Sequence, residues 1–153
     1  MSAPIPDDFM MLAFQEAEAA AARGEVPVGA VLVDSANGDV LATAGNQTEA
    51  ARDPTAHAEM LVIRAAAAKI GSARLVGCDL YVTLEPCAMC AAAASHARLR
   101  RVIYGAYDPK GGGVDHGARV FSQPTCHHRP EVVGGVNASR AEGLLKAFFA
   151  ARR

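Results

Sequence analysis

The chain has 153 residues, of which 51% are hydrophobic and 20% are charged, with four cysteines and a formal net charge of −1. These values predict one folded domain over residues 1–153 with a single hydrophobic core, and they exclude a disordered chain and a membrane-spanning one. The first eight residues lack the basic flank and apolar stretch of a signal peptide, and four cysteines are too few for a disulfide scaffold, so we expect a cytoplasmic protein with reduced thiols.

The N-terminal half of the sequence predicts two helices separated by a β-hairpin. A helix is expected over residues 9–22, ended by Gly24, and strands over 28–33 and 40–44 flank the Asn37-Gly38 turn. Residues 46–53 are expected to form a loop. A second helix is expected to open at Pro54 and Thr55, with Thr55 as its N-cap, and to run through His57 to about Lys69 before Gly71.

Strands and helices continue to alternate in the C-terminal half. A strand is expected over 80–84, and Pro86 lies at the first turn of a helix from Cys87 to about Ala97. The alternation predicts an α/β fold in which helices cover both faces of a sheet. The remaining expected elements are short strands at 102–104 and 131–133, a glycine-rich loop at 110–113, and a last helix at 139–152 with Leu144, Leu145, Phe148 and Phe149 on its apolar side.

Two short motifs place metal-binding side chains at two separate helix starts. His57-Ala58-Glu59 lies at one, and Pro86-Cys87-Ala88-Met89-Cys90 lies at the other. Cysteines three residues apart share a helix face, and the dipole at a first helical turn favours their thiolates. Thiolates and imidazole are ligands that zinc prefers, and three protein ligands leave a fourth position for water. Glu59 is then the carboxylate that takes a proton from this water, provided that His57 falls within the first helical turn.

Either motif alone is a weak signal, whereas the two together are a strong one. A Cys-x-x-Cys pair is also typical of a redox dithiol, and a histidine and two cysteines can be inert core residues. The redox alternative has less support, because His57 offers the cysteines a partner for metal binding. We therefore predict zinc-dependent hydrolysis with His57, Cys87 and Cys90 as ligands and Glu59 as the proton carrier.

The small net charge hides an uneven distribution. From Arg98 to the C-terminus there are ten basic and four acidic residues, a formal charge of +6, and the rest of the chain carries −7. Such a segment can form an anion-binding face. It can equally be a solvated surface balanced by nearby acids, and charge alone favours that simpler interpretation.

Five segments, residues 25–33, 53–59, 81–90, 101–108 and 148–153, carry a family resemblance that covers nearly the whole chain. The chain resembles the cytidine-deaminase-like superfamily and, within it, the bacterial tRNA-specific adenosine deaminases. Residues 83–87 (TLEPC) followed by Met89-Cys90 are specific to this branch. Free-cytidine deaminases typically have Cys where this chain has His57, and riboflavin-pathway deaminases usually carry an insertion between the two cysteines.

The resemblance implies a three-layer α/β/α fold around a five-stranded mixed sheet, with Zn²⁺ as cofactor, in a homodimer whose interface shares the tRNA contacts. It implies conversion of the wobble adenosine of a tRNA anticodon to inosine: Zn²⁺ and Glu59 activate a water that attacks C6 of adenine, and ammonia leaves. A deaminase of free guanine, cytosine or a nucleoside such as adenosine would use the same site. A third alternative, a non-catalytic zinc-binding interaction module, would not need Glu59.

The resemblance also implies which residues contact the base. Asn46 matches the family asparagine that contacts it, and the backbone N–H near Ala58 and the carbonyl of Glu85 are further candidate contacts. Asp108 and Lys110 match the loop beside the substrate nucleotides. From the sequence alone, Asn46 is more simply interpreted as a loop or cap residue after Gly45.

The C-terminal helix is expected to reach the anticodon loop, where aromatic stacking and phosphate pairing are needed. Because adjacent helix positions cannot both face the core, we expect one phenylalanine to be buried and the other to face RNA. The residues that match the family here are Phe148, Phe149, Arg152 and Arg153.

The chain departs from the family pattern on the RNA side. Members often have Asn-His-Arg before the last strand, where this chain has Cys126-His127-His128-Arg129, so His127 stands at the position of an RNA-contacting asparagine. The glycine-rich loop 111–117 also differs. A second metal site built from Cys126, His127, His128 and His116 has little support against ordinary polar contacts, and Cys78 is expected to be buried and inert.

Overall fold

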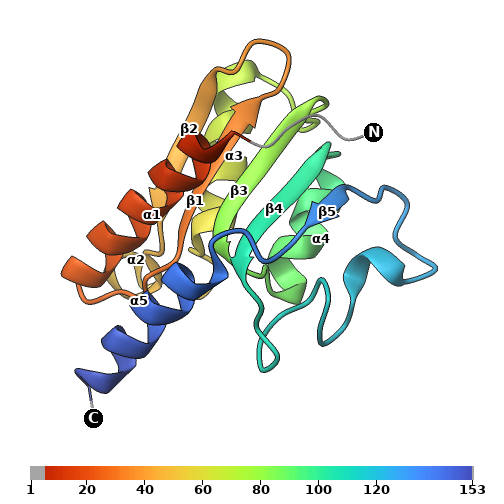
Figure 1. Ribbon diagram of the computed structural model, residues 1–153. Helices are drawn as coiled ribbons and strands as arrows, with labels where there is room; N and C mark the ends of the chain where they lie inside the picture. The colour runs from red at the N-terminus through yellow and green to blue at the C-terminus, as the bar shows by residue number, and fades with distance from the viewer. Residues whose placement is uncertain (1–5, 153) are drawn as a thin grey trace.

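The computed structural model describes residues 6–152, which form a five-stranded mixed sheet with helices on both faces (Figure 1). β1 pairs antiparallel with both β2 and β3, whereas the pairs β3–β4 and β4–β5 are parallel. The expected α/β/α fold with a mixed five-stranded sheet is confirmed. The spatial order of the strands is β2 (Val40–Gly45), β1 (Gly29–Asp34), β3 (Cys78–Leu84), β4 (Arg101–Ala106) and β5 (Glu131–Val133).

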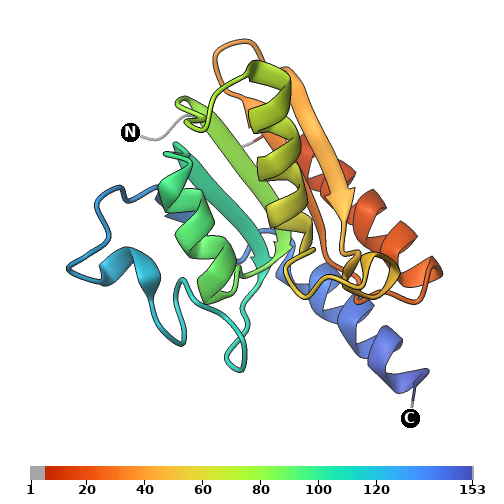
Figure 2. The same cartoon turned by 180° about the vertical axis from the view of Figure 1, so that it is seen from behind.

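Helices α1 (Asp7–Ala22) and α5 (Ala138–Ala150) cover one face of the sheet, and α3 (Ala58–Ile70) and α4 (Ala88–His96) cover the other (Figures 1 and 2). Side chains alternate between the two faces along each strand. Val31 and Tyr81 therefore pack on the side of α1, whereas their neighbours Leu32 and Leu80 pack on the side of α3 and α4. The sheet thus separates two hydrophobic clusters.

Helix α1 lies directly on β1 and β2 because two strand positions are glycines. A Cβ at Gly29 would lie 2.6 Å from the backbone nitrogen of Ala17, and a Cβ at Gly45 would lie 2.6 Å from the carbonyl oxygen of Glu16. Side chains at these positions would push the helix away from the sheet. The two glycines therefore set the distance between the layers.

The topology gathers several chain segments at one edge of the sheet. Because β1 runs antiparallel to both neighbours, Gly29 at its start lies beside Gly45 at the end of β2, and Ala30 pairs with Val82 near the end of β3. The chain leaves β2 and β3 at this edge and enters α3 and α4 there. Residues that are far apart in the sequence are therefore neighbours where the two helices begin.

The structure corrects several expected boundaries. Residues 46–53 contain a short helix, α2 (Thr48–Ala51), and a 3-10 turn, η1 (Val120–Ser122), follows the glycine-rich loop. The second long helix begins at Ala58, with His57 as its N-cap, so the expectation that Thr55 caps it is wrong. Thr55 instead donates through its N–H and hydroxyl to the carboxylate of Asp53, and this local turn keeps Thr55 out of the helix. Within residues 6–152, every helix is too short or too polar to span a membrane.

Candidate active site and metal centre

A cavity of about 390 Å³ opens at the edge of the sheet where α3 and α4 begin. Its walls come from the segment before β1, the segment after β2, the end of β3, the two helix starts and the segment after β4. The cavity contains both halves of the predicted metal motif. Among its lining residues are Asn46, His57, Glu59, Glu85, Cys87 and Asp108.

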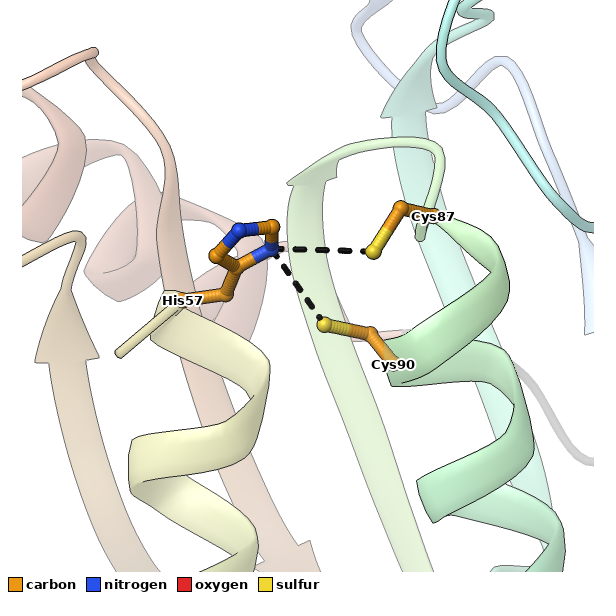
Figure 3. Close-up of side chains that lie close together, drawn as sticks. All are labelled: His57, Cys87 and Cys90. Carbon is orange, nitrogen blue, oxygen red and sulfur yellow. Dashed lines mark hydrogen bonds between the residues drawn. The ribbon is translucent and has the colours of Figure 1, made fainter. Parts of the chain in front are cut away.

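His57, Cys87 and Cys90 come together on one side of this cavity (Figure 3). His57 Nδ1 lies 3.6 Å from Sγ of Cys87 and 3.6 Å from Sγ of Cys90. The three atoms all lie within 4.8 Å of one another, so they can hold one metal ion. One imidazole nitrogen and two sulfurs form a donor set that suits zinc.

The two motifs meet because His57 and Cys87 are both N-cap residues. Each has extended backbone angles just before its helix, α3 or α4, so its side chain is not confined to a helix face. Figure 3 shows His57 pointing from the start of α3 toward the two thiols at the start of α4. The expectation that His57 lies within the first turn of the helix is therefore wrong. His57 precedes α3, and from there its side chain reaches the same site as Glu59.

The environment of the two cysteines separates their acidities. Hydrogen bonding from Cys90, and then from His57, lowers the pKa of Cys87 to about 4. The same pairing with Cys87, together with burial, raises the pKa of Cys90. In the absence of a metal, one thiolate therefore forms readily and the second thiol shares its proton with it. The positive ends of the α3 and α4 dipoles also point at this group and favour the thiolate.

Glu59 is buried in the first turn of α3, beside the three candidate ligands. Burial raises the pKa of its carboxyl to about 7, although a hydrogen bond from its own backbone N–H opposes this rise. A carboxyl group that titrates near neutral pH can accept a proton in one step and return it in the next. The geometry therefore suits the proton-carrier role expected for Glu59.

Asn46 lies between β2 and α2, and its residue surface is only 7% exposed. Its backbone is fixed, because its N–H donates to Val28 and its carbonyl accepts from Arg23. Its side-chain Nδ2 donates to Thr48 Oγ1 at 3.4 Å. Its Oδ1 has no hydrogen-bond partner within the described part of the chain. An amide oxygen left unpaired at a cavity wall is available to a ligand.

Glu85 carries a feature that the sequence did not predict. Its carbonyl was the expected contact, but its carboxylate is also buried and accepts hydrogen bonds from the segment 108–116. The effect of burial on its carboxyl is outweighed by these donors, led by the Asp108 N–H, so its pKa lies below the usual value. The partners lie 23 to 31 residues away in the sequence, so no local pattern announces them.

Of the two loop residues expected near the substrate, only Asp108 lies at the cavity. Asp108 lines the cavity together with Gly111, whereas Lys110 is exposed and does not line it.

In α5, Phe148 is 8% exposed and Phe149 is 50% exposed, which confirms the expectation of one buried and one exposed ring. Arg152 stacks its guanidinium 3.5 Å above the Phe148 ring. Arg153 lies outside the described residues.

The side chains considered for a second metal site do not come together in the structure. His116 contacts Glu85, His128 Nε2 lies 2.7 Å from the carbonyl oxygen of Leu99, and Cys126 contacts Ser95. His127 lines a separate cavity beside α4. Across residues 6–152, the group formed by His57, Cys87 and Cys90 is the one that can hold a metal. Cys78 is buried, as expected, and burial raises its pKa.

Comparison with protein families connects this site to known chemistry. Residues 5–106 match the family described as the cytidine and deoxycytidylate deaminase zinc-binding region. This range contains His57, Glu59, Cys87 and Cys90.

Three individual proteins show the range of similarity. The chain is 57% identical over 145 residues to the tRNA-specific adenosine deaminase of Agrobacterium fabrum, covering 95% of this chain and 94% of that protein. A structure from a study of A-to-I editing by tRNA:A34 deaminases at the wobble position of transfer RNA superimposes with a TM-score of 0.89 at 56% identity, over 92% of this chain and all of the other. Guanine deaminase from Bacillus subtilis is more distant, with a TM-score of 0.66 and 28% identity over 97% of this chain and 94% of that one.

The different acidities of the thiols predict selective alkylation of the metal-free protein. At pH 6 Cys87 is largely a thiolate, whereas Cys78 remains a buried thiol. Iodoacetamide should therefore modify Cys87 at least about tenfold faster than Cys78. Peptide mapping by mass spectrometry measures the two rates, and addition of Zn²⁺ should protect Cys87. Equal rates at the two cysteines, or no protection, would contradict this account of the site.

Proposed function

We propose that this chain, which belongs to the family of tRNA-specific adenosine deaminases, hydrolyses the wobble adenosine of a tRNA anticodon to inosine. One observation carries the proposal: the buried carboxyl of Glu59 lies beside a group of three metal-binding side chains in a cavity large enough for a base. A purely structural metal site has no use for such a carboxyl group.

His57, Cys87 and Cys90 would hold Zn²⁺. The fit rests on the donor set itself: one imidazole nitrogen and two sulfurs converge, and one of the sulfurs ionises easily. When bound, zinc brings the pKa of water at the site toward neutrality and so supplies a nucleophile. Three protein ligands leave room for that water.

Glu59 would move the protons of the reaction. Its carboxylate takes the two protons of the attacking water in turn and delivers one to N1 of adenine and the other to the nitrogen on C6, which leaves as ammonia. The oxygen of the water becomes the C6 carbonyl oxygen of inosine. The burial that raises the pKa of Glu59 supports this exchange, because both protonation states are accessible near neutral pH.

The base would be held by polar groups of the chain. Asn46 offers its unpaired Oδ1, and a base N–H at that position would relieve an unsatisfied buried acceptor, which costs about 1–3 kcal/mol. Ala58 is the first residue of α3, where backbone N–H groups have no partner within the helix. Together with the carbonyl of Glu85, these groups supply a donor and two acceptors around the base.

A deaminase of a free base or nucleoside would use the same centre, and the likeness to guanine deaminase is the observation in its favour. The likeness to tRNA-specific adenosine deaminase is twice as strong in sequence identity, 57% against 28%, at a similar coverage of both chains. The exposed ring of Phe149 adds to this, because a splayed anticodon loop needs a surface for stacking. These observations together favour tRNA.

The RNA-binding face would lie around the mouth of the cavity. Arg152 Nη2 lies 4.0 Å from the position that a Cβ would take at Gly24, next to Arg23, whose guanidinium donates to the carbonyl of Asn46. The end of α5 is therefore close to the wall that carries Asn46. The RNA contacts proposed here are Asp108, Lys110, His127, Phe149, Arg152 and Arg153, whereas the buried ring of Phe148 supports the guanidinium of Arg152.

We also propose a cytoplasmic homodimer that buries the outer face of α4. This helix, AMCAAAASH, is apolar all round, which is typical of a helix covered on every side. Yet Ala88 is exposed, and Met89, Ala92 and Ala93 are only half-buried. A second copy of the chain packed against this face would cover them. The cytoplasm would keep Cys87 and Cys90 reduced for metal binding.

The activity is tested with an unmodified tRNA that carries adenosine at the wobble position, in parallel with free adenosine, guanine and cytosine. We expect inosine in the tRNA, read by sequencing, and no ammonia from the free compounds. The Glu59→Gln variant should retain one zinc per chain, measured by elemental analysis, and lose activity at least about a hundredfold. Ammonia from a free base with untouched tRNA would overturn the substrate, and full activity of Glu59→Gln would overturn the proton carrier.

The role of the C-terminal helix predicts a charge-dependent loss of binding. Arg152→Ala should weaken tRNA binding several-fold at low salt and reduce the slope of log K against log salt by about one unit or less. Lys69→Ala is the matched control, because it removes a charge at the far end of α3, roughly 16 Å along the helix from Ala58. Filter binding at several salt concentrations measures both. Equal behaviour of the two variants would remove Arg152 from the RNA face.

The dimer predicts that an arginine on α4 separates the subunits. Ala93→Arg places a charge on the half-buried outer face and should shift the sedimenting species from dimer to monomer. Ala19→Arg on the exposed side of α1 introduces the same residue in the opposite layer and should leave the dimer intact. A monomeric native chain, or a dimer unaffected by Ala93→Arg, would overturn this interface.

A further inference from the structure

The Glu85 carboxylate is the most extensively hydrogen-bonded acid side chain near the candidate site. Its side chain has no exposed surface, although it stands between the end of β3 and the metal-binding turn. Oε1 accepts from the N–H of Asp108 at 3.0 Å and from Nδ1–H of His116 at 2.8 Å. Oε2 accepts from the N–H groups of Val114, Asp115 and His116 at 3.1, 2.9 and 3.0 Å.

The five donors come from the two ends of one loop, residues 108–116. The Asp108 N–H lies near the end of β4, where the loop begins. The other four donors belong to residues 114–116, where the loop ends. One carboxylate therefore closes the loop on itself, as a bound anion would. The buried Tyr104 also attaches the loop to the core, because its hydroxyl donates a hydrogen bond to the carboxylate of Asp115.

The glycines of this loop fit that closure. A Cβ at Gly112 would lie 2.5 Å from Cδ of Glu85, and a Cβ at Gly113 would lie 2.6 Å from Cα of Ala88. The Gly113 N–H donates to the carbonyl of Pro86 at 2.8 Å. The run of glycines thus allows the backbone to pass directly over Glu85 and the start of α4.

The loop held in this way is a wall of the cavity. Asp108 and Gly111 line it, and Asp108 Oδ1 accepts from the N–H groups of Lys110 and Gly111 to shape the turn between them. Glu85 lies two residues before the candidate ligand Cys87. The same short segment thus supplies both a candidate metal ligand and the anchor of the wall that faces it.

We propose that Glu85 is a positioning residue whose carboxylate holds the loop 108–116 as the wall that orients the target base, without its side chain touching the base. Every acceptor position that Glu85 uses is directed at the loop, and the side chain is fully covered, so it cannot serve as a second proton carrier. This inference rests on the proposed function, because the rate of deamination reports the position of the wall.

The Glu85→Gln variant tests the proposal. With its oxygen at the Oε2 position, glutamine still accepts from residues 114–116, but its amide nitrogen then faces the Asp108 N–H and leaves it unpaired. A loosened wall lets the base enter in unproductive orientations, and a displacement of about 1 Å can cost up to about a hundredfold in rate. We expect kcat on tRNA to fall at least about tenfold. KM should change less than about twofold, because phosphate contacts outside the cavity supply most of the affinity.

Three further measurements separate positioning from a general structural effect. The zinc content of Glu85→Gln should stay at one per chain, and amide hydrogen exchange should accelerate in residues 108–117 but not in α3. The matched control is Asp79→Asn, which alters another buried carboxylate at the opposite end of β3, roughly 20 Å away, where Asp79 pairs with Arg100 and Arg101. It should lower thermal stability while kcat stays unchanged.

His116→Ala and Gly112→Ala keep the proposal testable if Glu85→Gln fails to fold. His116→Ala removes one of the five donors and should lower kcat by a smaller factor, again at constant KM. Gly112→Ala should push the loop off the carboxylate and reproduce the Glu85→Gln result. An unchanged kcat, an unchanged loop exchange rate, or activity lost only in proportion to zinc would overturn the proposal. If the native protein leaves tRNA unedited, the proposed function fails, and loop exchange alone still decides whether Glu85 holds the loop.

Discussion

The chemistry of this site depends on two helix starts that lie side by side at one end of the sheet (Figure 3). His57 and Cys87 are N-cap residues of α3 and α4, so each side chain leaves the helix axis and enters the space between the two N-termini. The partial positive charges of both helix ends converge there. This field favours thiolates and a carboxylate over their neutral forms, so it offsets part of the cost of burying the three candidate ligands and Glu59 together.

Two buried carboxylates then hold the walls on either side. Glu25 accepts from the N–H groups of Glu49 and Ala50 at the start of α2, which follows Asn46, and Glu85 accepts from the loop that begins at Asp108. Burying a carboxylate is costly unless it is hydrogen-bonded. Moving either wall would remove the N–H donors of its carboxylate, so each carboxylate opposes movement of the wall that it contacts. The cavity is therefore rigid for an electrostatic reason as well as by packing. Such pre-organisation is what an enzyme needs to orient a substrate.

Local patterns in the sequence predicted the parts of the structure that depend on neighbouring residues. The helix and strand alternation was predictable because hydrophobic spacing and turn residues encode it. The pairing of His57 with Cys87 and Cys90 was predictable for another reason: their side chains are complementary zinc ligands. The start of α3 was not, since Thr55 is a good cap by type but bonds to Asp53 instead. The carboxylate of Glu85 was missed for a related reason. Glu-Pro-Cys indicates a turn before a helix, whereas its partners are supplied by tertiary structure.

Counting the charges of the basic C-terminal segment overestimates the number of residues available to bind an anion. Of its ten basic residues, Arg100 and Arg101 pair with Asp79 at the opposite end of β3 from the cavity, and Arg140 pairs with Glu18 of α1. These three arginines stabilise the fold and are not arranged to meet an anion at the cavity. Arg152 differs, because its guanidinium lies over the Phe148 ring at the exposed end of α5. Stacking and the hydrogen bond from Nη1 to the carbonyl of Phe148 fix the direction of this charge, and a charge held in this way is better suited to the proposed phosphate contact than a freely solvated one.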